Sequence, residues 1–592
     1  MLLNCHSYYS FHYGTVSPKQ LLEIAVRAGA QTVALTDVNS SAACLEFLRQ
    51  SHEFDVHPVV GIDFKVKAQT KYVALARNND GFREINKHLS QHLMYNEEVS
   101  NRAPEFQHAY VIYPLEMLAR VCNACGNKSH ALQTRGSLSE FSSPPEKEGC
   151  PEGTGWFLRE NEFIGIRPSD LTRLRFSPWK KHKDKLVALQ PMTFRSKYDF
   201  NTHRLLRSID QNCLLSKLSA DQQTTEKDTF WSCEMLREAF AEFPHILANT
   251  EQLLQDCHVN FEFGNYNISH NQHHFLGSFQ EDKERLEQLC QQNIKYRYPK
   301  PNKTVLDRLK KELDIIEQKK FFSYFLINHN IVQYAKHKGY FHIGRGSGAN
   351  SMVAYIIGIT DVDPIELDLY FERFINPSRK NPPDFDIDFS WKDRADVTRY
   401  IFERFPKAAL QGSYSTFKEK SVKRELGKVL GLPTEEIDRL NSRYTNLNSL
   451  DHLSKLVLKY GHRIQGFPNH TTVHSSGILI PELDMHSYSA TFLPPKGFPT
   501  TQFDMHVAED VGLHKFDILA QRGLGKIKDS ISIIRENRNK EIDIHDIQRF
   551  KEDPAIKKLL KYGKTVGAFY VESPAMRMLL IKLKAEDYNR LV

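Results

Sequence analysis

Three aspartates alternate with large apolar residues in one short segment, Pro-Pro-Asp-Phe-Asp-Ile-Asp-Phe, residues 382–389. A period of two predicts a strand with Asp384, Asp386 and Asp388 on one face and apolar residues on the other. Carboxylates on one face repel one another unless solvent or a divalent cation takes up their charge. Because the flanking residues are apolar, a buried strand with a cation site is favoured over a strand whose acidic face is merely solvated.

A glycine-rich segment, Gly344-Arg345-Gly346-Ser347-Gly348, precedes these aspartates and leads into a helix predicted over 349–357. Glycine backbone amides and a helix N-terminus can together cradle a phosphate. The segment is not a Walker A loop, because no Lys-Ser or Lys-Thr follows the last glycine. The alternative interpretation is a tight turn between packed elements.

A third segment, residues 513–519, reads Leu-His-Lys-Phe-Asp-Ile-Leu and predicts another strand, with Lys515 and Asp517 on one face. Taken alone, this pattern indicates little. Together with a phosphate loop and an acidic strand, it completes the parts needed for two-metal nucleotidyl transfer, in which carboxylates hold divalent cations and basic residues bind a triphosphate.

The motifs GRGSGANSMVAY, GITDVDP, FERFINP, PPDFDIDF and HKFDIL follow one another in order and resemble the palm of the C-family replicative polymerases, the family of bacterial DNA polymerase III alpha subunits. That palm is similar to the polymerase beta class of nucleotidyltransferases. The resemblance implies DNA-directed DNA polymerase activity, with dNTPs and a primed DNA template as substrates and two Mg²⁺ ions as cofactors.

The resemblance also implies roles for particular residues. The catalytic, metal-holding carboxylates would be Asp384, Asp386 and Asp517, and Asp388 would be a neighbour. The residues near the nucleotide would be Gly346 and Ser347 in the triphosphate turn, the basic residues Arg373 and Lys515, and Arg345. For Arg345 the alternative is a structural ion pair.

The N-terminal segments HSYYSFHYG, ALTDVNS and VVGIDF resemble the strand ends of the PHP (polymerase and histidinol phosphatase) family, whose barrel holds a cluster of metal ions. His6 and Asp37 fit that pattern. Asn4 and Val38 stand where the family has histidines, and Asp63 stands where it has a glutamate. The segment VALQPMTFRS supplies neither the expected Asp nor the expected His. The resemblance therefore implies a folded barrel whose metal site is degenerate, without phosphoesterase or proofreading activity.

Helical and strand patterns alternate through this N-terminal part and predict an α/β fold. Ser17-Pro18 predicts the start of one helix. Between 120 and 155 the pattern gives way to a low-complexity insertion. Cys122, Cys125, His130 and Cys150 lie in this insertion and are candidate zinc ligands. The absence of a second Cys or His pair at the usual spacing argues against a zinc site.

Residues 417–430, FKEKSVKRELGKVL, predict a helix that presents Lys420, Arg424 and Lys428 on a single face. A solvated surface is the common explanation of such a stripe. In a polymerase thumb, the same stripe would run along the phosphates of duplex DNA and give sequence-independent affinity.

Length and composition set the outer limits of these interpretations. A chain of 592 residues predicts several domains, and a net charge of +7 is compatible with a polyanionic partner. No run of about 18 apolar residues predicts a membrane span. The start of the chain lacks the features of a secretory signal, so we expect a cytoplasmic protein whose nine cysteines are free thiols.

The expected architecture is an α/β multidomain chain: a PHP-type α/β barrel followed by a polymerase beta-like palm with a helical thumb. The expected segments are a PHP-like domain at 1–260, palm at 261–415, thumb at 416–495, palm again at 496–545 and the start of truncated fingers at 546–592. Residues 567–592 resemble the first helices of those fingers.

Two alternatives to an active polymerase remain: a PHP-type metal-dependent phosphoesterase or exonuclease, and a catalytically incomplete polymerase fragment. The resemblance further implies that a sliding clamp and other replisome subunits are partners, through a C-terminal region absent from this sequence.

Overall fold

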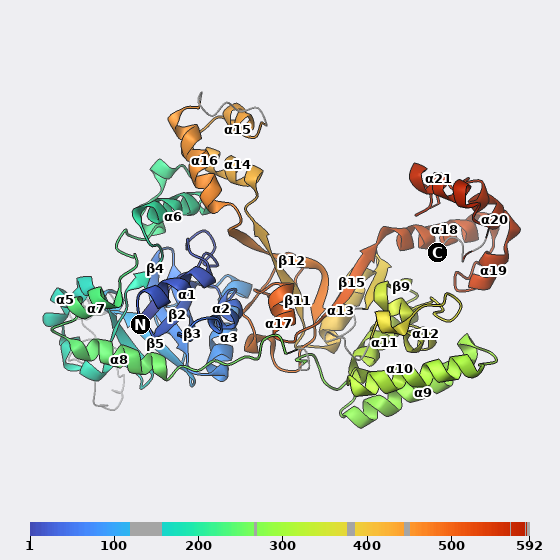
Figure 1. Ribbon diagram of the computed structural model, residues 1–592, viewed down its shortest axis with the longest axis horizontal. Coiled ribbons are helices and arrows are strands. Elements are labelled where there is room, and N and C mark those ends of the chain that lie inside the picture. Colours follow the sequence, from blue (N-terminus) through green and yellow to red (C-terminus); the bar gives the residue numbers. More distant parts are fainter. Residues whose placement is uncertain are drawn as a thin grey trace, which may run out of the picture. The chain divides into compact units, whose positions relative to one another are not determined.

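The computed structural model describes residues 1–118, 157–265, 269–375, 385–442, 450–568, 570–586 and 588 (Figure 1). The chain divides into two compact units. Unit 1 comprises Met1–Asn265, Ala409–His474 and Leu483–Gly512, and unit 2 comprises Tyr266–Ala408, Ser475–Glu482 and Leu513–Val592. In the described ranges, no helix has the length and apolar character needed to cross a lipid bilayer. The six cysteines in these ranges are all free thiols.

The N-terminal part of unit 1 is built on one curled sheet. Among the described residues its strands lie in the order β7-β6-β5-β4-β3-β2-β1-β8. Strand β4 is antiparallel to both of its neighbours, and the remaining pairs are parallel. The strands are β1 (Leu2–Cys5), β2 (Thr32–Val38), β3 (His57–Val66), β4 (Gln69–Ala76), β5 (Ala109–Pro114), β6 (Glu162–Ile166), β7 (Leu186–Ala188) and β8 (Pro191–Met192).

Helices α1, α2, α3 and α8 pack against this sheet (Figure 1). In α1 the side chain of Ser17 accepts a hydrogen bond from the Gln20 amide, Pro18 occupies the first turn, and Leu21 and Leu22 are buried, as the sequence predicts. The helices of this part are α1 (Pro18–Arg27), α2 (Cys44–Ser51), α3 (Asn79–Tyr95), α5 (Leu171–Arg175), α7 (Cys233–Ala239) and α8 (Pro244–Gln255).

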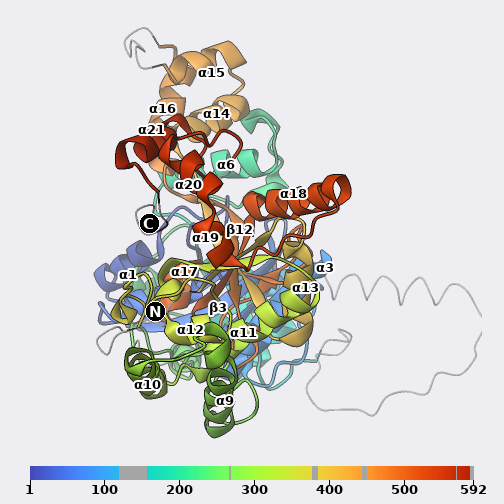
Figure 2. The ribbon, with the colours of Figure 1, turned by 90° about the vertical axis from the view of Figure 1, so that its right-hand side faces the viewer.

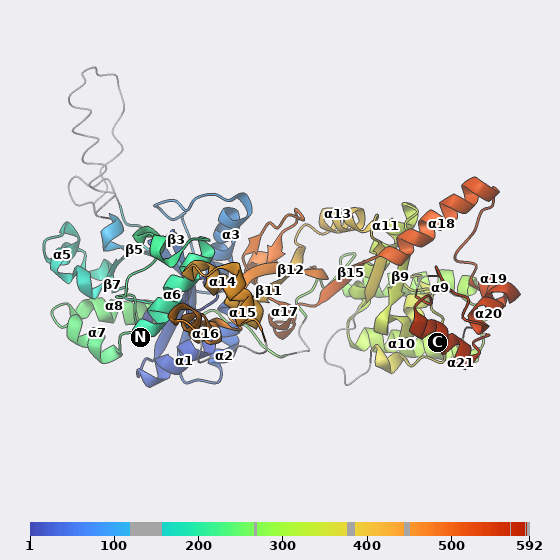
Figure 3. The ribbon, with the colours of Figure 1, turned by 90° about the horizontal axis from the view of Figure 1, so that it is seen from above.

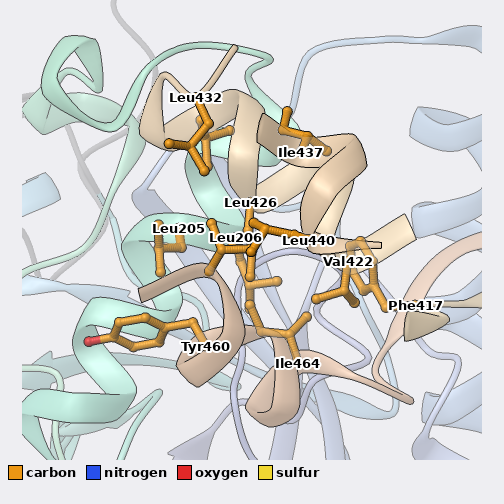
Figure 4. Close-up of a cluster of buried hydrophobic side chains, with 12 residues drawn as sticks. Leu205, Leu206, Phe417, Val422, Leu426, Leu432, Ile437, Leu440, Tyr460 and Ile464 are labelled. Carbon is orange, nitrogen blue, oxygen red and sulfur yellow. The ribbon is translucent and has the colours of Figure 1, made fainter. Parts of the chain in front are cut away.

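A second core of unit 1 joins helices that are distant in sequence. Helices α6 (Lys197–Asp210), α14 (Glu419–Leu430), α15 (Thr434–Leu440) and α16 (His452–Ile464) lie together in Figures 1 and 2. Leu205 and Leu206 of α6 insert between the apolar faces of the other three helices (Figure 4). At the edge of this core, the rings of Tyr198 and Tyr460 stack with centroids 4.9 Å apart.

The remaining elements of unit 1 follow this helical core. Strand β11 (Ala409–Thr416) pairs with β14 (Thr500–Thr501), which pairs with β13 (Thr491–Phe492), and α17 (Met505–Asp510) ends the unit. Strand β12 (Pro468–Leu479) begins in unit 1 and ends in unit 2.

Unit 2 contains the strands that carry the predicted site. Strand β10 (Asp386–Ser390) is antiparallel to β9 (His342–Arg345) and parallel to β15 (Lys515–Gln521), and β15 is antiparallel to residues 477–479 of β12. The helices of unit 2 are α9 (Phe279–Arg297), α10 (Lys303–Gln318), α11 (Phe322–His337), α12 (Met352–Ile356), α13 (Arg394–Arg404), α18 (Arg522–Arg538), α19 (Ile547–Glu552), α20 (Pro554–Lys561) and α21 (Pro574–Leu583). Helix α9 packs against α11 and α12, and α10 packs against α12; α9, α10 and α11 are seen in Figure 3.

An aromatic cluster fixes one face of these strands. Phe385 and Phe516 are buried, and the ring of Tyr324 on α11 lies 5.5 Å from the first and 4.9 Å from the second, between centroids. Side chains alternate along a strand. Because Phe385 and Phe516 are buried on one face, the next residues, Asp386 and Asp517, point to the opposite face. The α/β class and the apolar face predicted from the sequence are confirmed.

Candidate active site on two adjacent strands

Asp386 and Asp517 stand directly opposite each other in the parallel pair formed by β10 and β15. Neighbouring strands lie about 4.8 Å apart, so residues in register on one face bring their carboxylates together. Asp386 is half-buried and Asp517 is buried. The structure thus places two of the predicted carboxylates side by side, although 130 intervening residues separate them in the sequence.

Each of these carboxylates is paired with a basic residue. Arg345, opposite Asp386 in β9, donates from Nη1 to Asp386 Oδ2 at 3.1 Å and from Nε to Asp388 Oδ2 at 2.9 Å. The Lys515 ammonium donates to Asp517 Oδ2. The ion pair that was the alternative for Arg345 is therefore present, and its partners are the acidic residues of the site itself.

Ser476 orients the second carboxylate. Its hydroxyl donates to Asp517 Oδ1 over 2.6 Å, and its neighbour Gly477 stands opposite Asp517 in the antiparallel pair of β12 with β15. Arg394 supports the same strand by donating from Nε to the carbonyl of Ile518 at 2.9 Å. With Ser476 on Oδ1 and Lys515 on Oδ2, the Asp517 side chain is held in one orientation.

The glycine-rich segment forms a tight turn against β10. Residues Gly346–Asn350 are a 3₁₀ turn, and Gly346 has φ +71°, a conformation that favours glycine. A Cβ on Gly346 would lie 2.8 Å from Asp386 Oδ2, and a Cβ on Gly348 would lie 2.4 Å from the Phe385 ring. Glycine at both positions lets the backbone come within contact distance of Phe385 and Asp386.

The prediction that a helix N-terminus cradles phosphate here is wrong. Helix α12 starts only at Met352, and the buried carboxylate of Glu312 already accepts hydrogen bonds from the amides of Met352 and Val353 and from the Ser351 hydroxyl, at 2.9–3.1 Å. Arg308 donates to the same carboxylate at 2.7 Å. Because these amides are engaged, they are not available to an anion, and phosphate binding by the turn before the helix stays a prediction.

The other predicted nucleotide contacts border this turn. Ser347 is half-buried within it. Arg373 is exposed at the end of the 3₁₀ turn Phe371–Arg373, which contacts the turn Gly346–Asn350. Arg345, Gly346, Ser347 and the backbone that carries Arg373 therefore lie near the end of β10 that begins with Asp386.

Asp384 lies outside the described residues, so its role stays a prediction. In the described ranges, no three His, Cys, Asp or Glu side chains are grouped as a complete ligand set for a metal ion. The donors that are described still fit Mg²⁺, because it prefers carboxylate oxygens and two carboxylates stand in register on adjacent strands. Carboxylates on strands about 4.8 Å apart match two ions held roughly 3.5–4 Å apart.

The basic stripe predicted for the thumb lies on α14. Lys420, Arg424 and Lys428 are all exposed on this helix. Arg424 and Lys428 also contact Glu425, at 2.9 and 3.2 Å, and such exposed pairs are weak. The stripe keeps a positive surface in unit 1, and its contact with DNA stays a prediction.

The PHP-like residues of unit 1 are engaged with other protein groups. His6 Nε2 lies 3.0 Å from Asp63 Oδ2, and the Lys65 ammonium lies 2.9 Å from the same oxygen. Asp37 accepts hydrogen bonds from the Ser7 amide and hydroxyl and from the Ser10 hydroxyl, at 2.6–2.7 Å. The possible zinc ligands Cys122, Cys125, His130 and Cys150 lie outside the described residues.

Sequence reasoning missed two residues that shape the site, Ser476 and Glu312. Ser476 belongs to a run of small polar residues, and only strand register reveals that it faces Asp517. Glu312 lies on an amphipathic helix, where a glutamate is usually solvated, yet its side chain is completely buried. An acidic residue at a position of α10 that faces the core was the one available signal.

Three family models match successive parts of the chain. Residues 3–140 match the PHP domain, residues 284–520 match the bacterial DNA polymerase III alpha NTPase domain, and residues 523–592 match the bacterial DNA polymerase III alpha subunit finger domain. The second match contains Asp386, Asp517 and the turn beside them.

Curated relatives align over the entire chain. The DNA polymerase III alpha subunit of Halalkalibacterium halodurans is 27% identical, and those of Escherichia coli K12 and Bacillus subtilis 168 are each 26% identical, with 100% of this chain and 54% of each relative covered. The chain thus spans about half the length of these relatives. With its three domain matches in order and its paired aspartates on adjacent strands, the chain belongs to the family of bacterial DNA polymerase III alpha subunits.

Proposed function

We propose that this chain carries the catalytic palm of a DNA-directed DNA polymerase, which adds nucleotides from dNTPs to the 3′ hydroxyl of a primer and releases pyrophosphate. The observation that carries the proposal is the register of Asp386 opposite Asp517, beside a glycine turn that approaches the Asp386 carboxylate. Two-metal phosphoryl transfer requires paired carboxylates that hold the metal ions and, beside them, a turn that binds the phosphates.

Each residue of the site has a separate role in this proposal. Asp384, Asp386 and Asp517 would hold two Mg²⁺ ions, which when bound activate the primer hydroxyl and stabilise the charge of the leaving pyrophosphate. Ser476 keeps Asp517 oriented. The amides of the turn at Gly346 and Ser347 would bind the triphosphate oxygens.

The basic side chains of Arg345 and Lys515 have a second role in this proposal. Arg345 and Lys515 neutralise Asp386 and Asp517 in the structure. Since a bound divalent cation supplies the same charge, both side chains become available for the triphosphate, where Arg373 would join them. A guanidinium donates two parallel hydrogen bonds to phosphate, and an ammonium acts as a point charge.

DNA and protein partners complete the proposal. The stripe Lys420, Arg424 and Lys428 would follow the phosphates of the primed template. Contacts with a sliding clamp and other replisome subunits are part of the same proposal. A cytoplasmic location, predicted from the sequence, belongs to the same proposal.

Primer extension on a short primed template with Mg²⁺ and dNTPs tests the function. Asp386→Asn should reduce extension by at least about 10²-fold, the order seen when a group that stabilises developing charge is removed. The matched control is Asp529→Asn, because Asp529 is an exposed aspartate of unit 2 whose partner is Lys392.

Other outcomes distinguish the alternatives. A folded wild-type chain that does not extend the primer would be a catalytically incomplete polymerase fragment. Shortening of a 3′-mismatched primer with Mn²⁺ or Zn²⁺, lost in His6→Ala, would instead establish a PHP-type hydrolase. Equal extension by wild type and Asp386→Asn would refute the assigned carboxylate role.

A further inference from the structure

Lys65 carries a buried positive charge at the place where a PHP-type fold would hold metal ions. Its side chain is 1% exposed, and that of Asp63, two residues earlier on β3, is completely buried. The ammonium lies 2.9 Å from Asp63 Oδ2 and also donates to the hydroxyl of Thr70, its cross-strand partner on β4. A fully buried lysine is rare and requires a paired anion.

The carboxylate of Asp63 is the centre of this cluster. Its Oδ2 atom accepts hydrogen bonds from His6 Nε2 at 3.0 Å, from Thr70 Oγ1 at 3.2 Å and from Asn4 Nδ2 at 3.3 Å, besides contacting Lys65. Burial alone would raise the pKa of Asp63, but Lys65 and His6 outweigh it and hold that pKa below its ordinary value. Asp63 is therefore ionised, with Lys65 as its counter-ion.

The other residues at this place use the atoms that a metal would need. With Nε2–H donating to Asp63, His6 accepts at Nδ1 from the Thr193 hydroxyl at 2.9 Å, so both ring nitrogens are engaged. Burial lowers the pKa of His6, which keeps the ring neutral. Asp37 is satisfied by Ser7 and Ser10. Among the described donors here, Asp63 Oδ1 and the hydroxyl of Tyr13, whose ring packs against His6, have no hydrogen-bond partner, and these two oxygens do not make up a ligand set for a metal ion.

We propose that Lys65 is the resident cation of the unit 1 sheet: its ammonium supplies the charge that metal ions supply in a PHP-type site, so this unit folds and keeps its structure without bound metal. The inference concerns unit 1 alone and does not depend on the proposed polymerase activity of unit 2. It assigns to Lys65 a function that a chain with an intact set of metal ligands would not need.

The first test is metal content. The full chain carries Asp386→Asn and Asp517→Asn, which remove the proposed palm ligands. It is incubated with Zn²⁺ or Mn²⁺ and dialysed, and its metal content is measured by inductively coupled plasma mass spectrometry. We expect far less than one ion per chain and a melting temperature unchanged by chelator. A stoichiometric ion that is lost in His6→Ala would overturn the proposal.

The second test is the charge balance. Lys65→Met leaves the Asp63 carboxylate buried without its counter-ion, and we expect the melting temperature of unit 1 to fall by at least about 5 °C. The matched control is Lys67→Met, which removes an exposed partner of Asp221 and should change the melting temperature by less than about 1 °C.

A double variant separates charge from packing. Lys65→Met combined with Asp63→Asn removes both charges, and we expect it to recover most of the lost melting temperature. If Lys65→Met alone fails to fold, a folded double variant still supports the proposal. A double variant no more stable than Lys65→Met, or equal melting of Lys65→Met and Lys67→Met, would show that Lys65 does not act as the counter-ion.

Discussion

Gly346 and Asp386 approach so closely that one methyl group on the glycine would lie 2.8 Å from the carboxylate oxygen Oδ2. The turn and strand β10 are thus fitted to each other at a single point. Any side chain at residue 346 must displace either the turn or the carboxylate, so under the proposed function one contact would affect both nucleotide binding and metal binding.

The first prediction compares two glycines with the same backbone requirement. Gly346 has φ +71° and Gly339 has φ +69°, but a Cβ on Gly339 would meet nothing within 4 Å. Replacing either with alanine should cost about 1–2 kcal/mol of stability through the left-handed backbone. Only Gly346→Ala should also reduce primer extension, by at least about 10-fold, because it displaces Asp386. Equal activities in steady-state assays would contradict the fitted contact.

The second prediction concerns Glu312, which accepts hydrogen bonds from two backbone amides, a hydroxyl and Arg308. Glu312→Gln keeps the size of the side chain but turns an amide donor toward groups that are themselves donors. Chemical denaturation should show a loss of about 1–3 kcal/mol. The KM for dNTPs should rise more than kcat falls, since the adjoining turn loosens.

Glu317→Gln on the same helix is the control, because Glu317 is an exposed partner of Lys283. Its denaturation curve and KM should match those of the wild type. If the two glutamine variants behave alike, the anchoring role of Glu312 is wrong.

The third prediction addresses the basic stripe of α14. Replacing Lys420, Arg424 and Lys428 together with alanine should weaken binding to duplex DNA of any sequence and lower the slope of log K against log salt by up to about 3. A triple alanine variant at the exposed residues Lys180, Lys181 and Lys183 controls for the change of net charge. Equal salt slopes for the two variants in fluorescence anisotropy would exclude α14 as the DNA-binding face.

The fourth prediction is a pH dependence in unit 2. The Asp361 carboxylate accepts from His545 Nδ1 in an ion pair 3.5 Å long and raises the pKa of that imidazole above its ordinary value. A raised pKa in the folded state means that the interaction stabilises fully below about pH 6.5 and is lost as the pH rises through the raised value. Amide hydrogen exchange around residues 543–549 should therefore be slower in wild type than in His545→Asn at pH 6, and the difference should vanish by about pH 9. A difference independent of pH would rule out titration of His545.

Local pattern over residues 382–389 was enough to predict strand β10 (Asp386–Ser390) and its apolar face. Alternation determines which side chains share a face, and Phe385 and Ile387 are buried as that rule requires. The same applies to the first helix, since the capping group at Ser17 and the apolar stripe after it act within a few residues of each other.

Long-range pairing was beyond such patterns. Nothing near Asp386 indicates that β15 is its neighbour or that the register places Asp517 opposite it, because strand pairing depends on the whole sheet. The availability of the α12 N-terminus was mispredicted for the same reason. Its amides donate to Glu312, which belongs to another helix, α10. Lys65 likewise reads as an ordinary strand residue until Asp63 and Thr70 are seen around it.

The helical core that joins α6 to α14 and α16 bears on how the protein is made. Leu205 and Leu206 emerge from the ribosome well before Tyr460 and Ile464, their partners in the finished core. At roughly 5–20 residues per second, the intervening chain of about 250 residues takes some 10–50 seconds to synthesise. During that interval the apolar face of α6 lacks its partners from α16, so we expect the nascent chain to expose apolar surface of the kind that chaperones bind.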